Sequence, residues 1–339
     1  MPKTYNNLYP KIITWENLYS AYSLAAKGKR YRNDALLFRD RLEENLAGLQ
    51  DHLTWETWRP SPYKAFTVYE PKERLIMAPS FPDRVAHHAL VNVISPLFEK
   101  KFIFDSYACR NGKGMHAAAH RVQDFLRAGK RKWGRAYVLK ADISRYFPSV
   151  SAAALSGIIL RTIRDSKVLS LCRTIIDHGA NRGTGMPVGS LTSQLWANIY
   201  MDQLDHIAKE REGIKYYARY MDDWVVIGPT KAWLWEKLRV LTGFLSDALK
   251  LKLNPKTGIF PASHGVDFCG YRIWDTHIRP RKRNVRRAKE RFCRLARAYS
   301  AGRVSMRMIM ASIASFIGYM KHCSGADSTR SALRYIDIK

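Results

Sequence analysis

Apolar side chains at helical spacing predict helices across the first 60 residues. They recur from Trp15 to Tyr22 and again from Leu36 to Leu49, which gives each segment one apolar face. The basic stretch KGKRYR separates the two runs. We therefore expect an N-terminal helical extension over residues 1–60.

From Pro60 onward the pattern changes to one that is typical of strands. The stretch YKAFTVYEPKERLIMAPS is rich in β-branched and aromatic residues and contains Glu-Pro-Lys-Glu, which predicts a hairpin. A helix should follow from Asp83 to Leu97. Residues 136–150 predict a strand that ends at an aromatic turn, and residues 215–229 predict a hairpin with Met-Asp-Asp at its tip.

The remaining pattern alternates helices with short strands. A helix is predicted from Leu191 to Lys209, another over residues 231–250, a short strand over 266–274 and a largely helical, basic tail over 280–338. No internal repeat is visible, so we expect one continuous α+β scaffold.

Charge narrows the choice of partner. The 339 residues include 57 Lys and Arg against 29 Asp and Glu, a formal net charge of +28. An excess this large favours a polyanion, and nucleic acid above a membrane surface. Hydrophobic residues make up 46% and aromatic residues 12% of the chain, which is the profile of a folded protein.

Cysteine usage indicates a reducing compartment. The five cysteines are odd in number and lack C-x-x-C spacing, so neither a disulfide framework nor a zinc site is expected. The N-terminal residues show no secretion signal. We therefore expect a cytoplasmic protein.

Three aspartates in apolar surroundings are the candidate catalytic residues. Asp222 and Asp223 lie within the hydrophobic hairpin, and Asp142 ends a second apolar strand. A β-turn and a helix cap are the alternative explanations for these positions. Carboxylates on adjacent strands also suit hard Mg²⁺, and nucleotidyl transfer uses two such ions.

The motifs in their order resemble those of reverse transcriptases. YMDD followed by an apolar strand resembles the palm motif of that family, and the similarity extends over residues 69–275. The other motifs, in chain order, are PKERLIMAPSFPDRVAHHAL, SYACRNGKGMHAA, LKADISRYFPSV, GMPVGSLTSQLWANIY, LKLNPKTGI and FCGYRI. The resemblance implies a right-hand polymerase architecture, with fingers and an antiparallel palm over residues 61–272 and a helical, basic thumb over 273–339.

The resemblance also assigns roles to individual residues. Asp142, Asp222 and Asp223 would bind two Mg²⁺ ions, or Mn²⁺ in their place, together with the backbone carbonyl of Ile143. Phe147 would exclude a ribose 2′-hydroxyl, with core packing as the alternative. Further nucleotide-binding candidates are Lys72, Arg74, Arg110, Lys113, Val188, Gln194 and Lys256. A solvated turn is the alternative for Lys256. Template and primer would bind along the basic tail at Arg281, Lys282, Arg283, Arg286 and Arg287.

The fourth motif points to one branch of the family. Most retroviral and intron-encoded relatives carry Pro-Gln-Gly where this chain has Pro187-Val188-Gly189, and Ser193-Gln194 stands where Ser-Pro is usual. The combination resembles the reverse transcriptases of diversity-generating retroelements. These copy a template-repeat RNA into cDNA with errors concentrated at adenines. The resemblance implies RNA, dNTPs, a cDNA product and a small basic oligomeric accessory protein as partners.

Other interpretations remain open from the sequence. Val188 replaces a hydrogen-bonding Gln and could lower fidelity, or it could be a packing residue. A retron-like or phage-defence reverse transcriptase is the alternative enzyme, although no Val-Thr-Gly signature occurs in the C-terminal region. An intron-encoded enzyme fits less well, because the Gln of Pro-Gln-Gly is replaced by Val188 and we expect no maturase extension. An inactive RNA-binding module would be expected to lose one of the three acids.

Overall fold

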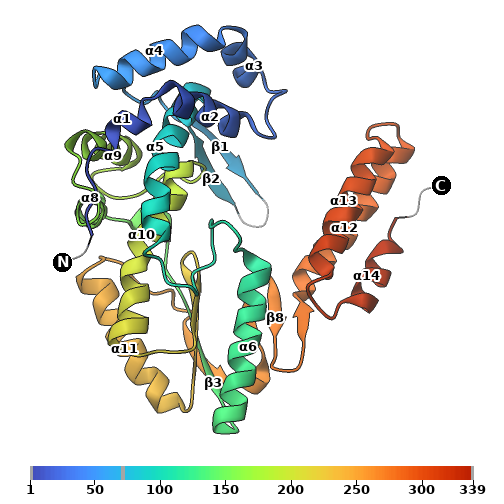
Figure 1. Ribbon diagram of the computed structural model, residues 1–339. Coiled ribbons are helices and arrows are strands. Elements are labelled where there is room, and N and C mark those ends of the chain that lie inside the picture. Colours follow the sequence, from blue (N-terminus) through green and yellow to red (C-terminus); the bar gives the residue numbers. More distant parts are fainter. Residues whose placement is uncertain (1–2, 70–72, 337–339) are drawn as a thin grey trace. The chain divides into compact units, whose positions relative to one another are not determined.

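The computed structural model describes residues 3–69 and 73–336 (Figure 1). The chain forms two compact units, and each is assembled from segments that are distant in sequence. Unit 1 contains residues 1–104, 143–211 and 241–255, and unit 2 contains residues 105–142, 212–240 and 256–339. The three-part division of the sequence at residues 60 and 272 stays a prediction.

Helix α5 is the centre of unit 1, and helices α2 and α10 pack against it. The Ser80 hydroxyl caps α5 by accepting a hydrogen bond from the Asp83 amide, which satisfies one of the free donors of the first turn. The helices predicted over residues 15–60 and 83–97 are confirmed. The helices of unit 1 are α1 (Tyr9–Ile12), α2 (Trp15–Ala26), α3 (Asn33–Asp40), α4 (Leu42–Thr54), α5 (Phe81–Glu99), α7 (Tyr146–Ser149), α8 (Ala152–Leu160), α9 (Ser166–Gly179) and α10 (Leu191–His206).

The hairpin predicted after Pro60 is also confirmed. Strand β1 (Lys64–Val68) pairs antiparallel with β2 (Arg74–Ala78). Most of its side chains are exposed, and an isolated pair of strands is only marginally stable. The Met77 amide donates a hydrogen bond of 2.8 Å to the Val188 carbonyl. This bond joins β2 to the loop before α10.

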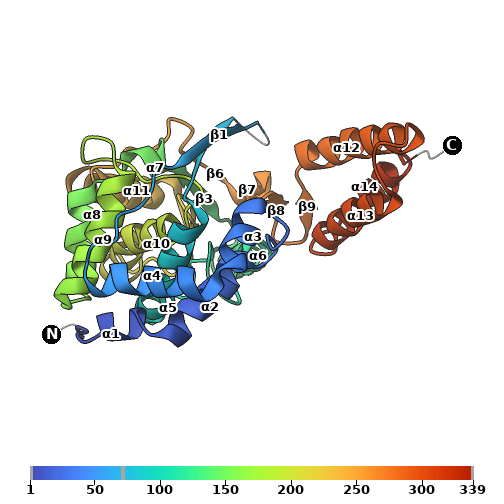
Figure 2. The ribbon, with the colours of Figure 1, turned by 90° about the horizontal axis from the view of Figure 1, so that it is seen from above.

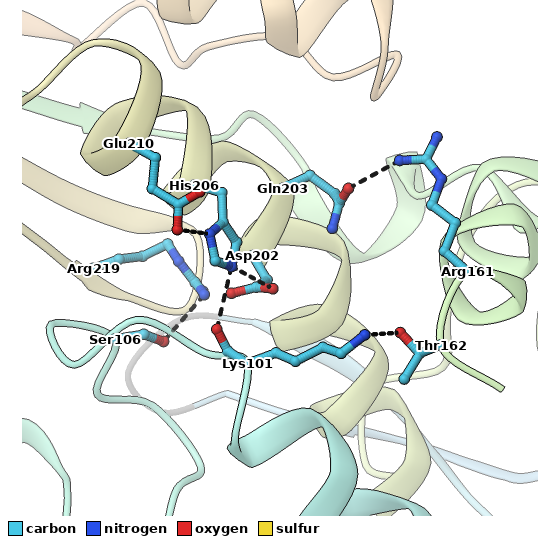
Figure 3. Close-up of polar contacts among 9 residues, drawn as sticks. All are labelled: Lys101, Ser106, Arg161, Thr162, Asp202, Gln203, His206, Glu210 and Arg219. Atoms are coloured by element: carbon cyan, nitrogen blue, oxygen red, sulfur yellow. Dashed lines mark hydrogen bonds and ion pairs between the residues drawn. The ribbon is translucent and has the colours of Figure 1, made fainter. Parts of the chain in front are cut away.

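Helix α10 continues into a π-helical turn, Ile207–Arg211 (η1), and the two together carry a compact polar cluster of Asp202, His206 and Glu210 (Figure 3). His206 Nε2 lies 3.3 Å from an Asp202 carboxylate oxygen, and His206 Nδ1 lies 2.6 Å from a Glu210 carboxylate oxygen. Hydrogen bonding to Asp202 raises the pKa of His206 to about 9 against the opposing effect of burial. The imidazolium therefore bridges two acids, one four residues before it and one four residues after it.

Unit 2 is built on a four-stranded antiparallel sheet in the order β4-β5-β3-β6. Helix α6 (Met115–Trp133) packs on β4 and β5, and its Val122, Phe125 and Leu126 share a core with Val225 and Ile227 of β5. The strand and hairpin predicted around the three aspartates are confirmed. The strands are β3 (Tyr137–Asp142), β4 (Tyr217–Tyr220), β5 (Asp223–Gly228) and β6 (Gly258–Pro261). Helix α11 (Lys231–Asp247) begins in unit 2 and ends in unit 1.

The single strand predicted over residues 266–274 is wrong, because the chain reverses there. Strand β7 (Val266–Phe268) pairs with β8 (Tyr271–Ile273), and β9 (Ile278–Pro280) completes a second antiparallel sheet. Cys269 and Gly270 have φ of 48° and 85°, as the two central residues of a type I′ turn require. Cys is uncommon at such a position, so the apolar run concealed the turn.

The last three helices of the described residues share a small hydrophobic core. Phe292 of α12 and Phe316 of α13 meet edge to face, with ring centroids 5.5 Å apart, and Ala332 of α14 completes the cluster. Both views show α12 and α13 side by side (Figures 1 and 2). The basic, largely helical tail is thereby confirmed. The helices are α12 (Lys282–Ser300), α13 (Met306–Met320) and α14 (Ala326–Leu333).

The architecture agrees with the fold class that the sequence predicts. The chain is a mixed α+β chain with an antiparallel central sheet and a helical C-terminal part, as expected for a right-hand polymerase. None of the helices in residues 3–69 and 73–336 is long and apolar enough to cross a membrane.

The His206 cluster predicts a pH-dependent contribution to stability. The folded pKa of about 9 exceeds the ordinary value of about 6.5. The stabilisation is therefore complete below about pH 6.5 and is lost as the pH rises through 9. Because a third of the side chain is exposed, solvent screening limits the effect to about 1 kcal/mol.

The test compares His206→Gln with the wild type by urea unfolding at pH 6 and pH 9.5. We expect the loss in free energy of unfolding to be larger at pH 6. His264→Gln is the control, because its exposed side chain should give the same small change at both values. An equal loss for His206→Gln at both pH values would contradict the assignment.

Candidate active site

The two adjacent acids lie at the tight turn between β4 and β5. Tyr220 and Asp223 are paired, so Met221 and Asp222 form a two-residue turn. Met221 has φ of 59°, as the first position of a type II′ turn requires. A residue other than glycine is strained in this conformation by about 1–3 kcal/mol. The surrounding contacts must therefore hold the turn in place.

Asp142 and Asp223 are direct cross-strand partners in the pairing of β3 with β5. Side chains opposite each other in an antiparallel pair point to the same face, with Cβ atoms roughly 5 Å apart. Two carboxylates at that separation repel by about 3 kcal/mol at an effective dielectric constant of about 20. Both residues are partly buried. This end of the sheet therefore requires positive charge.

Lys140 supplies one positive charge at this end of the sheet. It precedes Asp142 by two residues, shares its face of β3 and forms an ion pair with Asp223. Its ammonium also lies 5.3 Å from the centroid of the Phe268 ring. Burial lowers the pKa of Lys140 to about 8, although Asp142 nearby raises it. The sheet thus provides a cation for one of its own acids.

The donor set suits a hard divalent cation, because it consists of carboxylate oxygens on adjacent rigid strands. The strand register brings the backbone of Asp142 beside that of Asp223, and Asp222 follows directly in the turn. Within the described ranges, however, no three His, Cys, Asp or Glu side chains are gathered closely enough to hold a metal ion. The Asp223 carboxylate is instead directed to Lys140.

Arg110 and Lys113, two of the predicted nucleotide-binding residues, follow Ser106, which pairs with Arg219 of β4. Arg110 Nη1 donates a hydrogen bond of 2.9 Å to the Ser106 carbonyl. The ammonium of Lys113 lies 5.0 Å from the Tyr107 ring centroid. Both side chains are half-buried. Unit 2 therefore holds these two cations close to the segment that pairs with β4.

A third predicted cation of unit 2, Lys256, is exposed in the turn before β6. Gly258, two residues later, pairs with Lys140 of β3. Ile143, the predicted carbonyl ligand, follows Asp142 and forms an isolated bridge with Leu253. The catalytic and ligand roles of these residues stay predictions.

The remaining nucleotide-binding candidates belong to unit 1. Arg74 is exposed at the start of β2, and Lys72 lies outside the described residues. Phe147 is half-buried in α7, and its carbonyl accepts a hydrogen bond of 2.9 Å from Met186. Val188 follows Met186 and is bonded to β2. Backbone bonds thus connect the segments that carry Phe147, Val188 and Arg74.

Gln194 and the predicted nucleic-acid contacts are mostly at the surface. Gln194 is exposed on the first turn of α10. Lys282, Arg283 and Arg286 are exposed on α12, whereas Arg287 is half-buried. Arg281 precedes α12, and its Nε lies 3.5 Å from an Asp267 carboxylate oxygen. An exposed basic helix face suits phosphate contacts, and the assignment of these residues stays a prediction.

Two charged residues beside the acids were missed by sequence reasoning. Lys140 stands inside AYVLKAD, and Arg219 stands inside KYYARYMDD. A charged residue in an apolar strand run is costly to bury without partners, and this was the available signal. The partners, however, come from segments that are distant in sequence.

Comparison with known proteins identifies the family. Residues 67–273 match the family model described as Reverse transcriptase (RNA-dependent DNA polymerase), which covers more than half of the chain and all three acids. The chain therefore belongs to the reverse transcriptase family and is an RNA-directed DNA polymerase.

The individual proteins that resemble this chain have low sequence identities to it. Protein YkfC of Escherichia coli (strain K12) is 29% identical over 291 residues, which cover 73% of this chain and 74% of YkfC. Group II intron-encoded protein LtrA of Lactococcus lactis subsp. cremoris is 24% identical over 204 residues, which cover 57% of this chain and 32% of LtrA. A solved telomerase from Candida albicans has a TM-score of 0.47 and 13% identity, over 71% of this chain and 52% of that chain. The chain thus spans about half of the telomerase and a third of LtrA.

The loop before α10 generates a prediction about Gly189. A Cβ atom there would lie 2.8 Å from Ile76 Cγ2, and φ is 118°. We expect Gly189→Ala to lower the free energy of unfolding by about 2–3 kcal/mol through strain and overpacking. If Arg74 of β2 has its predicted nucleotide-binding role, displacement of β2 should also raise the KM for dNTP.

Gly183→Ala is the matched control for this measurement. Gly183 also has positive φ (78°), but no atom lies within 4 Å of the added Cβ. Its loss should be limited to the backbone strain of about 1 kcal/mol. If the two substitutions lowered the free energy of unfolding equally in chemical denaturation, the close approach of Gly189 to β2 would contribute nothing to the loss.

Proposed function

We propose that the chain copies RNA into DNA by two-metal nucleotidyl transfer at Asp142, Asp222 and Asp223. The observation that carries the proposal is the pairing of Asp142 with Asp223 beside the Met221–Asp222 turn, in a chain of the reverse transcriptase family. Opposed carboxylates are unfavourable unless a cation lies between them. A site that collects such charge suits divalent metal ions.

Each residue of the proposed site has a separate task. When bound, two Mg²⁺ ions, or Mn²⁺ ions, lower the barrier by activating the primer hydroxyl and offsetting charge on the triphosphate. Asp142, Asp222 and Asp223 would hold the ions. Cationic side chains at Lys72, Arg74 and Lys256 would bind phosphate oxygens, with Arg making bidentate contacts and Lys acting as a point charge.

Removal of one acid tests the catalytic assignment. We expect Asp222→Ala to reduce primer extension on a poly-rA template by at least about a thousandfold, because a metal ligand is lost. Asp124→Ala is the control, since this acid is exposed on α6 and should leave the rate unchanged. Activity that survives in Asp222→Ala, or is absent in the wild type, would overturn the proposed mechanism.

We further propose that the enzyme makes error-prone cDNA from a template-repeat RNA in a diversity-generating retroelement. The support is the sequence Pro187-Val188-Gly189 with Ser193-Gln194. Val188 is half-buried beside β2 and offers an aliphatic side chain. Discrimination that depends on polar contacts weakens where a side chain cannot make them. The expected partners are a structured template RNA and a small basic accessory protein, in the cytoplasm of a bacterial host.

The fidelity hypothesis predicts a gain of accuracy in Val188→Gln. We expect adenine misincorporation to fall by about tenfold, the effect of restoring one hydrogen bond worth about 1.4 kcal/mol. The measurement is sequencing of cDNA made on a template that contains all four bases. Val188→Leu is the control, because it stays aliphatic. An unchanged adenine error frequency in Val188→Gln would remove Val188 from the explanation.

A second candidate is a retron-like or phage-defence reverse transcriptase, because the family match and the similarity to the group II intron-encoded protein LtrA fit it as well. The two candidates differ in the genomic neighbourhood and in the cDNA. A nearby pair of template and variable repeats, with errors at adenines, favours diversification. A lone structured RNA or a toxin gene favours a retron-like or defence role.

A further inference from the structure

Arg219 of β4 is fully buried, with 0% of its surface exposed. A guanidinium is costly to remove from water unless its donors are satisfied. Arg219 directly precedes the segment Tyr-Met-Asp-Asp. The pairing of Arg219 with Trp224 and of Tyr220 with Asp223 places Arg219 on the face of the sheet opposite to Asp223, because successive residues alternate.

The guanidinium binds the backbone of the catalytic turn. Arg219 Nη1 donates a hydrogen bond of 2.9 Å to the carbonyl of Met221, the residue with the strained φ. Arg219 Nη2 donates a hydrogen bond of 3.1 Å to Ser106 Oγ (Figure 3). One planar side chain thus contacts the turn and a second segment at once, which suits the fixed fork of donors in Arg.

The second segment is itself fixed to β4. The Arg219 amide donates to the Asp105 carbonyl at 2.9 Å, and the Tyr107 amide donates to the Arg219 carbonyl at 3.0 Å. The Asp105 carboxylate in turn pairs with Arg121 of α6 at 2.8 Å. Because β4 is an edge strand of the sheet, residues 105–107 cover its open side.

We propose that Arg219 is the positioning residue of the active site, which holds the Met221–Asp222 turn in its strained conformation from behind the acids. Its contacts keep Asp222 and Asp223 in register with Asp142. Through Ser106, whose carbonyl accepts from Arg110, the same side chain links the turn to a predicted nucleotide-binding cation. The proposal rests on the two-metal function proposed above.

A purely structural role for Arg219 makes a different prediction. It would lower thermal stability without changing metal binding or turnover in the molecules that remain folded. A positioning role lowers kcat and weakens metal binding, because misplacement of about 1 Å costs up to about a hundredfold in rate.

The experiment compares Arg219→Lys and Ser106→Ala with the wild type and with Arg121→Lys as control. Lys keeps the charge but cannot bridge both acceptors. Arg121→Lys disturbs the same segment at Asp105 without reaching the turn. The full-length protein is measured for Tm, for Mn²⁺ affinity by titration, and for kcat and the KM for dNTP on a poly-rA template.

We expect Arg219→Lys to lower kcat about tenfold or more and to weaken Mn²⁺ binding severalfold, with a KM for dNTP close to that of the wild type. Ser106→Ala should show the same changes to a smaller degree. Arg121→Lys should lower Tm alone. Wild-type kcat and Mn²⁺ affinity in folded Arg219→Lys, or equal changes in Arg121→Lys, would overturn the proposal.

Two further outcomes are decided by the same set. If Arg219→Lys does not fold, Ser106→Ala decides, and its unchanged kcat and Mn²⁺ affinity would overturn the proposal. If the wild type does not extend the primer, or Asp222→Ala still does, the two-metal function fails. The Mn²⁺ titration of Arg219→Lys would then still decide whether Arg219 shapes the carboxylate site.

Discussion

Two carboxylates face each other across adjacent strands, and the organisation of unit 2 follows from that opposition. Asp142 and Asp223 end and begin their strands at the same point of the sheet. Their repulsion would favour separation if the strands could move apart. Apolar residues behind them, such as Val138, Val225 and Ile227, are fully buried against α6, and burial of side chains of this size contributes about 1.5–3 kcal/mol each. The core therefore keeps the charges together.

The two cations beside the acids have different tasks. One balances their charge, and the other supports the backbone of the turn. Lys140 lies on the same face as the acids and pairs with Asp223. Arg219 lies on the other face and binds the backbone of the turn. A buried cation that forms an ion pair with a carboxylate competes with a metal ion for that carboxylate. A cation that binds a backbone carbonyl leaves the carboxylates available. The two cations thus act on the same acids in different ways.

Sequence reasoning was most successful where a local pattern and a chemical requirement coincided. Asp142, Asp222 and Asp223 interrupt apolar runs, so their strands and the turn between β4 and β5 could be inferred, and their catalytic role stays a prediction. The Cys269–Gly270 turn was missed, because Cys is uncommon in such a turn and apolar and aromatic residues flank it within VDFCGYRIW. Lys140 and Arg219 were missed for another reason. Their partners, Asp223 and Phe268 for Lys140 and Ser106 for Arg219, include residues that only the folded chain brings near.

The backbone hydrogen bond between Met77 and Val188 affects which substitutions this loop can accept during evolution. It is made by the backbone amide and carbonyl, so any side chain at position 188 keeps the loop attached to β2. Gly189 beside it has no such freedom, because the strand occupies the space for a Cβ. The two neighbouring positions of this loop therefore differ in the substitutions they tolerate. Position 188 can accept other side chains, whereas position 189 must stay glycine.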